Sequence, residues 1–191
     1  MKEGNNMKGC RVVSNQEIKK IISSLSIRDR VLVLTGLNFG TRISESLPLT
    51  FGDVSGKYIN IDSLKGSENA AFIIPPAYHQ AICELRDYYT SQGITVTDNT
   101  YLFQSKKGVN EHIKRCQASK IIKDACEDLG IEGKVCNHSF RKTFVTKIYE
   151  LTKYNIAQTK VYSRHKNLAN LDYYINTCQT TELINDLSWG V

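Results

Sequence analysis

The chain has 191 residues, of which 41% are hydrophobic and 23% charged, which suits one globular domain with a sizeable core. Its net charge of +6 permits a polyanionic partner such as nucleic acid. The sequence has no apolar run of the roughly 18 residues that a membrane span needs, and residues 1–20 lack the apolar stretch of a secretory signal. We therefore expect no membrane partner. The six cysteines form no C-x-x-C pair and have no zinc-binding spacing, so we expect no metal site. Scattered cysteines without a secretory signal also predict reduced thiols in a cytoplasmic protein.

Helices are expected in the first part of the chain, after a polar segment, residues 1–12, that is predicted to be disordered or extended. The S-x-x-E pattern from Ser14 to Glu17 is a capping box, which marks the start of the first helix. Gly40 is expected to end the second helix, and Thr41 to cap a short third one. The capping residues and the apolar spacing predict helices over residues 14–25, 27–40 and 42–47.

The apolar spacing changes from the helical period to strict alternation at residues 58–62, which predicts a strand. Lys65-Gly66-Ser67 follows as a turn, and residues 71–74 are expected to return as the second strand of a hairpin. The remaining helical spacing covers residues 76–89, 111–129, 138–152, 154–162, 168–177 and 180–188. These elements predict a mainly α fold with one small antiparallel β-sheet, an α+β class.

Two short motifs each place two polar side chains three residues apart, on one face of a predicted helix. Arg42 and Glu45 form the first motif, in which a carboxylate can hold a guanidinium that binds phosphate as a planar fork. His138 and Arg141 form the second, and Asn137 is expected to cap their helix, whose N-terminus favours an anion. Taken singly, either motif also fits an ordinary helix ion pair or a solvated helix start.

Further side chains have the chemistry to move protons or to attack a phosphate. Lys65, at the predicted hairpin tip, can protonate a leaving oxygen, although a turn lysine also serves solubility. A tyrosine hydroxyl has a pKa of about 10 and needs nearby positive charge to become a nucleophile. His165 precedes two adjacent tyrosines, Tyr173 and Tyr174, and helical spacing alone leaves open which of them reacts.

Taken in chain order, these motifs resemble those of the tyrosine recombinase (phage integrase) family over residues 12–180. The matching motifs are its first arginine box, its β-hairpin lysine, its H-x-L-R box and its last histidine with the nucleophile, at residues 35–54, 65–75, 138–141 and 165–174. The family spacing of nine residues between the last histidine and the nucleophile selects Tyr174 over Tyr173. The resemblance implies the family's catalytic-domain fold and its site-specific exchange of DNA strands.

The resemblance also implies a role for each proton-handling residue. Tyr174 attacks the scissile phosphate and forms a 3′-phosphotyrosyl link, His138 assists proton transfer at the tyrosine, and Lys65 protonates the departing 5′-oxygen. Ligation is the same path reversed. Because one phosphodiester is exchanged for another ester, the implied reaction needs no cofactor.

The phosphate-binding residues follow from the same resemblance. Arg42 and Arg141 hold the non-bridging oxygens and stabilise the charge that develops as phosphorus becomes five-coordinate. His165 hydrogen-bonds the phosphate, and Glu45 positions the basic groups.

One position departs from the family pattern, because Arg164 stands where the family usually has a glycine before the last histidine. We expect Arg164 and Lys166 to bind DNA, with the alternative that Arg164 distorts its loop. The implied partners are double-stranded DNA and further copies of the chain, assembled on DNA as a tetramer.

The resemblance divides the chain into a catalytic domain at residues 13–180 and a tail helix at residues 181–191. The tail is expected to dock on a neighbouring protomer or to fold back on its own domain. Family integrases also carry an N-terminal core-binding domain, so the chain is either an excised domain or a short natural recombinase. Two other functions remain open, namely DNA relaxation by a type IB topoisomerase and a non-catalytic DNA-binding relic of the fold.

Overall fold

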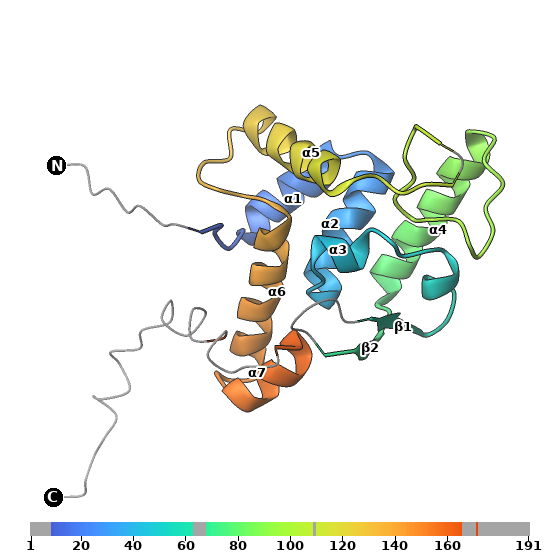
Figure 1. Cartoon of the computed structure of the whole chain (residues 1–191). Helices are drawn as coiled ribbons and strands as arrows, with labels where there is room; N and C mark the ends of the chain where they lie inside the picture. Colours follow the sequence, from blue (N-terminus) through green and yellow to red (C-terminus); the bar gives the residue numbers. More distant parts are fainter. Residues whose placement is uncertain (1–8, 63–67, 109, 166–170, 172–191) are drawn as a thin grey trace, which may run out of the picture.

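The structure, a computed structural model, describes residues 9–62, 68–108, 110–165 and 171 (Figure 1). Within these residues the fold is mainly helical with one antiparallel pair of strands, which confirms the predicted fold class. Helix α2 (Ile27–Phe39) lies in the middle of the helical part and packs against α4 (Pro76–Ser91) and α6 (Asn137–Leu151). No helix in these described ranges has the length and apolar character that crossing a lipid bilayer requires.

Helix α1 (Asn15–Ser24) begins at the predicted capping box. The Glu17 N–H donates to the Ser14 hydroxyl (3.3 Å), and the Ser14 N–H donates to the Glu17 carboxylate (2.9 Å). The buried side of α1 joins an apolar cluster with α2, α5 (Arg115–Asp128) and the start of α6. The local capping pattern was therefore sufficient to locate this helix.

The connection between α2 and the short helix α3 (Ile43–Ser46) differs by one residue from the prediction. Gly40 ends α2 in the left-handed conformation (φ 57°), but Arg42, not Thr41, is the N-cap of α3. The Thr41 hydroxyl instead pairs with the Ser46 hydroxyl (2.7 Å), while the Glu45 carboxylate accepts the Arg42 N–H (2.8 Å). The cap is therefore supplied from inside the helix by Glu45.

A 3₁₀ turn, η1 (Gly52–Val54), leads into the hairpin of β1 (Tyr58–Ile61) and β2 (Ala70–Ile73). The strands are antiparallel, with Ile59 opposite Phe72, so the second strand lies one residue earlier than predicted. Ile59 and Ile61 are buried, as the alternating pattern requires. The predicted turn at residues 65–67 lies outside the described residues.

The later helices are α5, α6 and α7 (Ile156–Ser163). The prediction that α5 begins at residue 111 is wrong. His112 forms a bridge with Gln104, and the Ile113 N–H donates to the Phe103 carbonyl (2.8 Å), so this segment uses its backbone groups in extended pairing. Apart from Leu171, the helices predicted at residues 168–177 and 180–188 lie outside the described residues.

Close packing of α2 on α6 sets the relative position of the later site residues. A Cβ atom at Gly36 of α2 would lie 3.0 Å from the Phe140 Cβ of α6, so a glycine is what lets the two backbones approach this closely. Phe140 is buried between the helices, and the following residue, Arg141, points to the C-terminal end of α2. The fold thus brings the start of α6 next to the α2–α3 connection.

Candidate functional site

The Arg141 guanidinium joins the C-terminal ends of α2 and α7. Its side chain is 1% exposed, and it donates to the Gly40 carbonyl at the end of α2 and to the Ser163 carbonyl at the end of α7 (2.9 Å). A buried guanidinium needs such partners, and the carbonyls at helix C-termini carry partial negative charge. These contacts fix the plane of the guanidinium group.

His165 lies directly beside Arg141. Its Nε2 is 3.3 Å from the Arg141 Nη2, and its Nδ1 is 2.8 Å from the Ser163 hydroxyl oxygen. Since a guanidinium can only donate, Nε2 accepts this contact, and the ring proton is therefore assigned to Nδ1. Burial, followed by the positive charges of Arg141 and Arg42, lowers the pKa of His165 to about 4, so the ring is neutral at pH 7.

Glu45 binds two guanidinium groups, one from Arg42, three residues earlier in the chain, and one from Arg164, 119 residues later. Its side chain is fully buried, and its carboxylate contacts Arg42 Nη1 at 3.2 Å and Arg164 Nη2 at 2.8 Å. Burial alone would raise the pKa of Glu45, but the Arg42 N–H and the Arg164 guanidinium outweigh it and lower the pKa. Glu45 therefore stays ionised and positions Arg42, whose side chain remains 29% exposed.

The structure corrects the expectation that Arg164 binds DNA. Its side chain is 1% exposed and donates to Glu45, so it is part of the buried support and not of the surface. Arg164 caps α7 in the left-handed conformation (φ 58°), which explains why a glycine suits this position.

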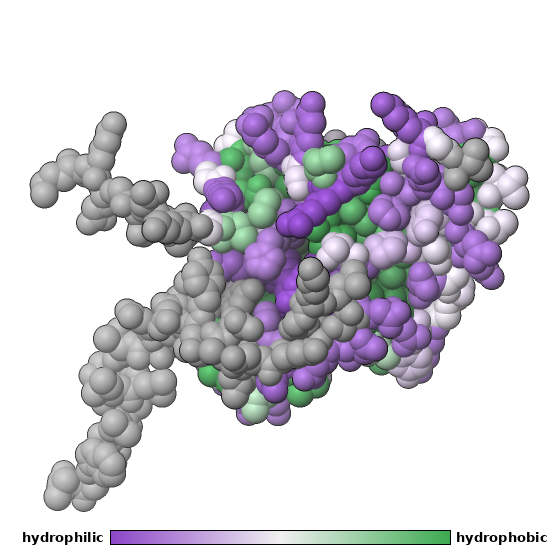
Figure 2. All heavy atoms as spheres, in the orientation of Figure 1, coloured by the Kyte–Doolittle hydropathy of each residue, from purple (hydrophilic) through white to green (hydrophobic). Residues whose placement is uncertain are grey.

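His138 lies in the first turn of α6, at the rim of a pocket of about 220 Å³. The pocket lining combines three elements, with residues Arg42, Ile43, Ser44, Arg115, Ser119, Cys136, Asn137 and His138. Although the His138 ring is exposed at the surface, partial desolvation by neighbouring atoms and the Arg141 charge lower its pKa. Figure 2 shows that hydrophilic side chains cover much of the face on which α3 and α5 lie.

The N-cap of α6 is Cys136, which corrects the expectation for Asn137. The Cys136 sulfur accepts the Ser139 N–H, and the Cys136 N–H donates to the Ser139 hydroxyl (3.1 Å). Sequence reasoning missed Cys136, Ser163 and Arg115 as parts of the site. For Cys136 a signal existed, because it stands two residues before the H-x-x-R motif, but thiols are uncommon caps.

Comparison with known proteins identifies the family. Residues 11–180 match the model of the Phage integrase family. This chain belongs to the phage integrase family. The resemblance inferred from the sequence motifs is thereby confirmed.

Two curated relatives are similar to this chain of the phage integrase family. It is 30% identical to "Probable integrase/recombinase YoeC" of Bacillus subtilis over 167 residues, which covers 87% of each protein. It is 27% identical to "Tyrosine recombinase XerA" of Pyrococcus furiosus over 144 residues, which are 72% of this chain but 48% of that protein. The chain thus spans nearly the full length of the first relative and about half of the second.

Solved structures of recombinases and integrases share the fold. The XerA recombinase superimposes with a TM-score of 0.71 and 24% identity, over 92% of this chain and 63% of that one. XerH bound to its difH substrate gives a TM-score of 0.68 and 19% identity, over 92% and 52%. The catalytic domain of bacteriophage HP1 integrase gives a TM-score of 0.58 and 16% identity, over 95% and 98%.

The structure brings together the predicted catalytic and supporting residues that it describes, which are Arg42, Glu45, His138, Arg141 and His165. Lys65, Lys166 and Tyr174 lie outside the described residues of this phage integrase family chain. The described end of the hairpin turn reaches the site, because the Glu68 N–H donates to the Arg164 carbonyl (3.1 Å). Among the described residues, no group of three or more His, Cys, Asp or Glu side chains lies close enough to hold a metal ion.

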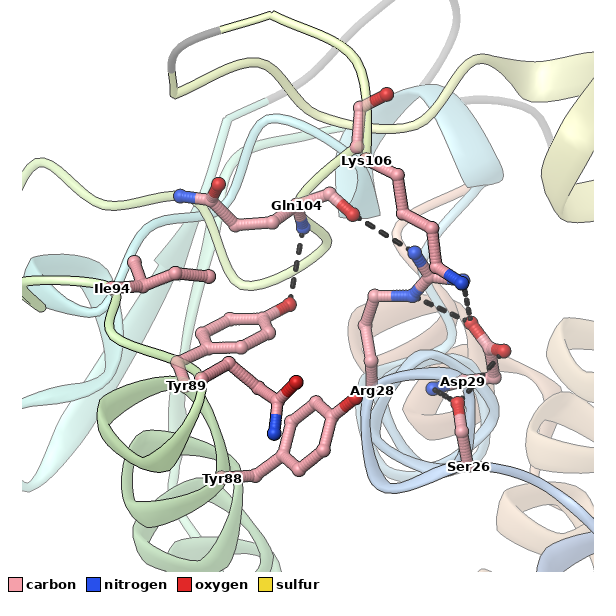
Figure 3. Close-up of a pocket in the computed structure, with 10 residues that line it drawn as sticks. Ser26, Arg28, Asp29, Tyr88, Tyr89, Ile94, Gln104 and Lys106 are labelled. Carbon is pink, nitrogen blue, oxygen red and sulfur yellow. Dashed lines mark hydrogen bonds and ion pairs between the residues drawn. The ribbon is translucent and has the colours of Figure 1, made fainter.

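A second pocket, of about 500 Å³, lies between the N-terminal end of α2 and the C-terminal end of α4 (Figure 3). Its polar groups bind one another. Arg28 contacts Asp29 (2.7 Å) and donates to the Gln104 carbonyl (2.9 Å), while the Gln104 N–H donates to the Tyr89 hydroxyl (3.2 Å). None of the predicted site residues that the structure describes lines this pocket.

Proposed function

We propose that this member of the phage integrase family is a site-specific DNA recombinase that cleaves and rejoins strands through a 3′-phosphotyrosyl intermediate. One observation carries the proposal. Arg42, Arg141 and His165, which are far apart in sequence, lie close enough for the two guanidinium charges to act on the imidazole. Two guanidinium groups, those of Arg42 and Arg164, share the Glu45 carboxylate, an arrangement that suits binding of a phosphodiester.

Phosphate binding falls to the two guanidinium groups and to His165. Arg42 is partly exposed, and the Arg141 guanidinium is fixed in place by its hydrogen bond to the Ser163 carbonyl. In the proposed complex a phosphate oxygen accepts hydrogen bonds from both arginines. Because the charge on the non-bridging oxygens changes most at the five-coordinate transition state, preorganised donors stabilise that state. A bound phosphate would also favour the protonated His165 ring, which then donates from Nε2.

Proton movement completes the proposed reaction. The lowered pKa of His138 leaves its imidazole neutral at pH 7, so it can accept the proton of the Tyr174 hydroxyl as that oxygen attacks phosphorus. The bond between phosphorus and the 5′-oxygen then breaks, and Lys65 supplies the proton to that oxygen. The reverse sequence rejoins the strand.

The proposal includes double-stranded DNA as substrate and a homotetramer on DNA, in the cytoplasm. Two neighbours support the DNA assignment by the complexes that their titles name, which are XerH on its difH substrate and a lambda integrase dimer on a core site. The family match supports residues 13–180 as the catalytic domain, with the tail at residues 181–191 outside the described residues. Lys166 remains a proposed DNA contact.

The test is covalent trapping on nicked suicide DNA substrates in the presence of EDTA, with pooled fragments of the source genome as DNA. We expect the wild-type protein and the matched control Tyr173→Phe to form a protein–DNA adduct, and Tyr174→Phe to form none. An adduct with Tyr174→Phe but not with Tyr173→Phe would assign the nucleophile to the other tyrosine. Absence of any adduct, with DNA binding retained, would favour a non-catalytic DNA-binding role.

A further inference from the structure

The start of the described chain runs along the N-terminal part of α6 (Figure 1). The Arg11 N–H donates to the Lys134 carbonyl (3.1 Å), and the Val13 N–H donates to the Thr143 hydroxyl of α6 (2.9 Å). The buried Lys142 ammonium donates to the Cys10 carbonyl (3.4 Å). These contacts hold Cys10 next to Cys136, the residue that caps α6.

The Cys10 and Cys136 side chains are neighbours, because each affects the pKa of the other. The Cys10 thiol is hydrogen-bonded to the Cys136 sulfur, and both residues are partly exposed free cysteines. This hydrogen bond, together with the N–H groups of His138 and Ser139, lowers the pKa of Cys136 to about 5, whereas the same bond raises the pKa of Cys10. Such a thiolate at a helix N-terminus is the reactive form of cysteine, with a protonated second thiol beside it.

Cys136 also lies at the proposed cleavage site. It lines the pocket that Arg42 and His138 share, and its charge acts on the His138 imidazole. The reaction proposed for DNA cleavage does not use either thiol. A partly exposed sulfur in this position is accessible to small solutes and close enough to the site to affect it.

We propose that Cys136 and Cys10 are a reactive thiol pair that low-molecular-weight disulfides convert into an intramolecular disulfide at the edge of the cleavage site. The Cys136 thiolate attacks one sulfur of the small disulfide R–S–S–R, forms a mixed disulfide and releases R–S⁻, which takes up a proton. Cys10 then loses its proton to solvent and attacks the Cys136 sulfur, which releases the second R–S⁻, and this thiolate also takes up a proton from solvent. Two protein thiols are oxidised, and one small disulfide is reduced to two thiols.

Oxidation removes the negative charge at the N-cap of α6 and ties residues 9–13 to this helix. Since the Cys136 charge raises the pKa of His138, its loss lowers that pKa further and changes the group that the proposed mechanism uses as a base. The consequence for DNA cleavage, a reversible loss of activity on oxidation, rests on the function proposed above.

The thiol chemistry is tested on the full chain with oxidised glutathione, followed by intact mass and peptide mapping. We expect the wild-type protein to lose the mass of two hydrogen atoms and to yield a peptide that links Cys10 to Cys136. Cys10→Ser should stop at one added glutathione on Cys136, and Cys136→Ser should form neither product. Cys83→Ser and Cys116→Ser, at exposed cysteines elsewhere, should behave as wild type. A wild-type protein that keeps both thiols, or that stops at the mixed disulfide, overturns the proposal.

The coupling to the site is tested without DNA by NMR titration of the His138 imidazole. We expect the pKa of His138 to be lower in the oxidised than in the reduced protein, and reduction with dithiothreitol to restore it. An unchanged His138 titration would overturn the coupling.

Covalent trapping then separates this inference from the proposed function. If the recombinase function is wrong, reduced wild type traps no DNA although the disulfide forms. If the thiol inference is wrong, oxidised wild type traps DNA as well as reduced wild type.

Discussion

The two ends of helix α2 each carry an arginine beside a carboxylate, but the charge balance differs. At the N-terminal end, Arg28 contacts Asp29 at 2.7 Å, so one guanidinium faces one carboxylate in the pocket of Figure 3. At the C-terminal end, Arg42 and Arg164 share Glu45, and Arg141 contacts backbone carbonyls. In the first arrangement one guanidinium group faces one carboxylate, whereas in the second two guanidinium groups share one carboxylate, which suits an additional anion. An arginine–carboxylate pair by itself therefore does not mark a functional site.

The largest expected effect is the loss of stability when the carboxylate at either end of α2 is replaced by an amide. Glu45→Gln leaves the buried Arg164 guanidinium without its carboxylate, and we expect a loss of about 3–5 kcal/mol in the free energy of unfolding. Asp29→Asn, at the other end of α2, should lose about 1–2 kcal/mol, because its partner Arg28 keeps the Gln104 carbonyl. Denaturant unfolding of both variants measures the difference. Equal losses would contradict the special role of the Glu45 cluster.

The second prediction concerns pH. The unfolded chain protonates His165 below a pKa of about 6.5, whereas the folded chain does so only near its lowered pKa of about 4, so the unfolded state holds more protons between these values. Stability should therefore fall as the pH is lowered from 6.5 to 4, by on the order of 3 kcal/mol from this residue. Unfolding of wild type and His165→Asn across this range measures the contribution. Parallel pH profiles would show that His165 does not titrate in this way.

The third prediction compares the two ends of α2 by the rate of covalent adduct formation. Arg141→Lys keeps a positive charge but loses the planar fork, and we expect the rate of covalent adduct formation to fall by about 100-fold. Arg28→Lys is the matched change at the opposite end of α2, and it should leave that rate unchanged. Single-turnover trapping gives both rates, and thermal unfolding checks that each variant is folded. A near-wild-type rate for Arg141→Lys would remove Arg141 from the phosphate clamp.

The smallest expected effect is at Ser163. Ser163→Ala removes the hydroxyl that the His165 Nδ1 contacts at 2.8 Å, and we expect a loss of about 1 kcal/mol in stability and a decrease of about tenfold or less in adduct formation. Adduct rates measured across pH provide the check. If Ser163 only filled space, Ser163→Ala would shift neither the rate nor its pH dependence.

Sequence reasoning succeeded where the signal was local. The capping box of Ser14 and Glu17 acts across three residues, and it located α1 correctly. The alternation at residues 58–62 likewise predicted β1. The reasoning failed at α5, because the extended pairing of His112 with Gln104 depends on a second segment. It failed at Arg164 because the ion pair joins residues separated by 119 positions.

By itself, the sequence determined the mainly helical class, most helix starts and the order of motifs that marks the phage integrase family. Caps, alternation and motif spacing act over a few residues, so they can be recognised without a fold. The tertiary structure alone decided that Arg164 supports Glu45, that Cys10 meets Cys136, and that the pKa of His165 is about 4. These properties arise from burial and from charges brought together by distant segments, which no local pattern records.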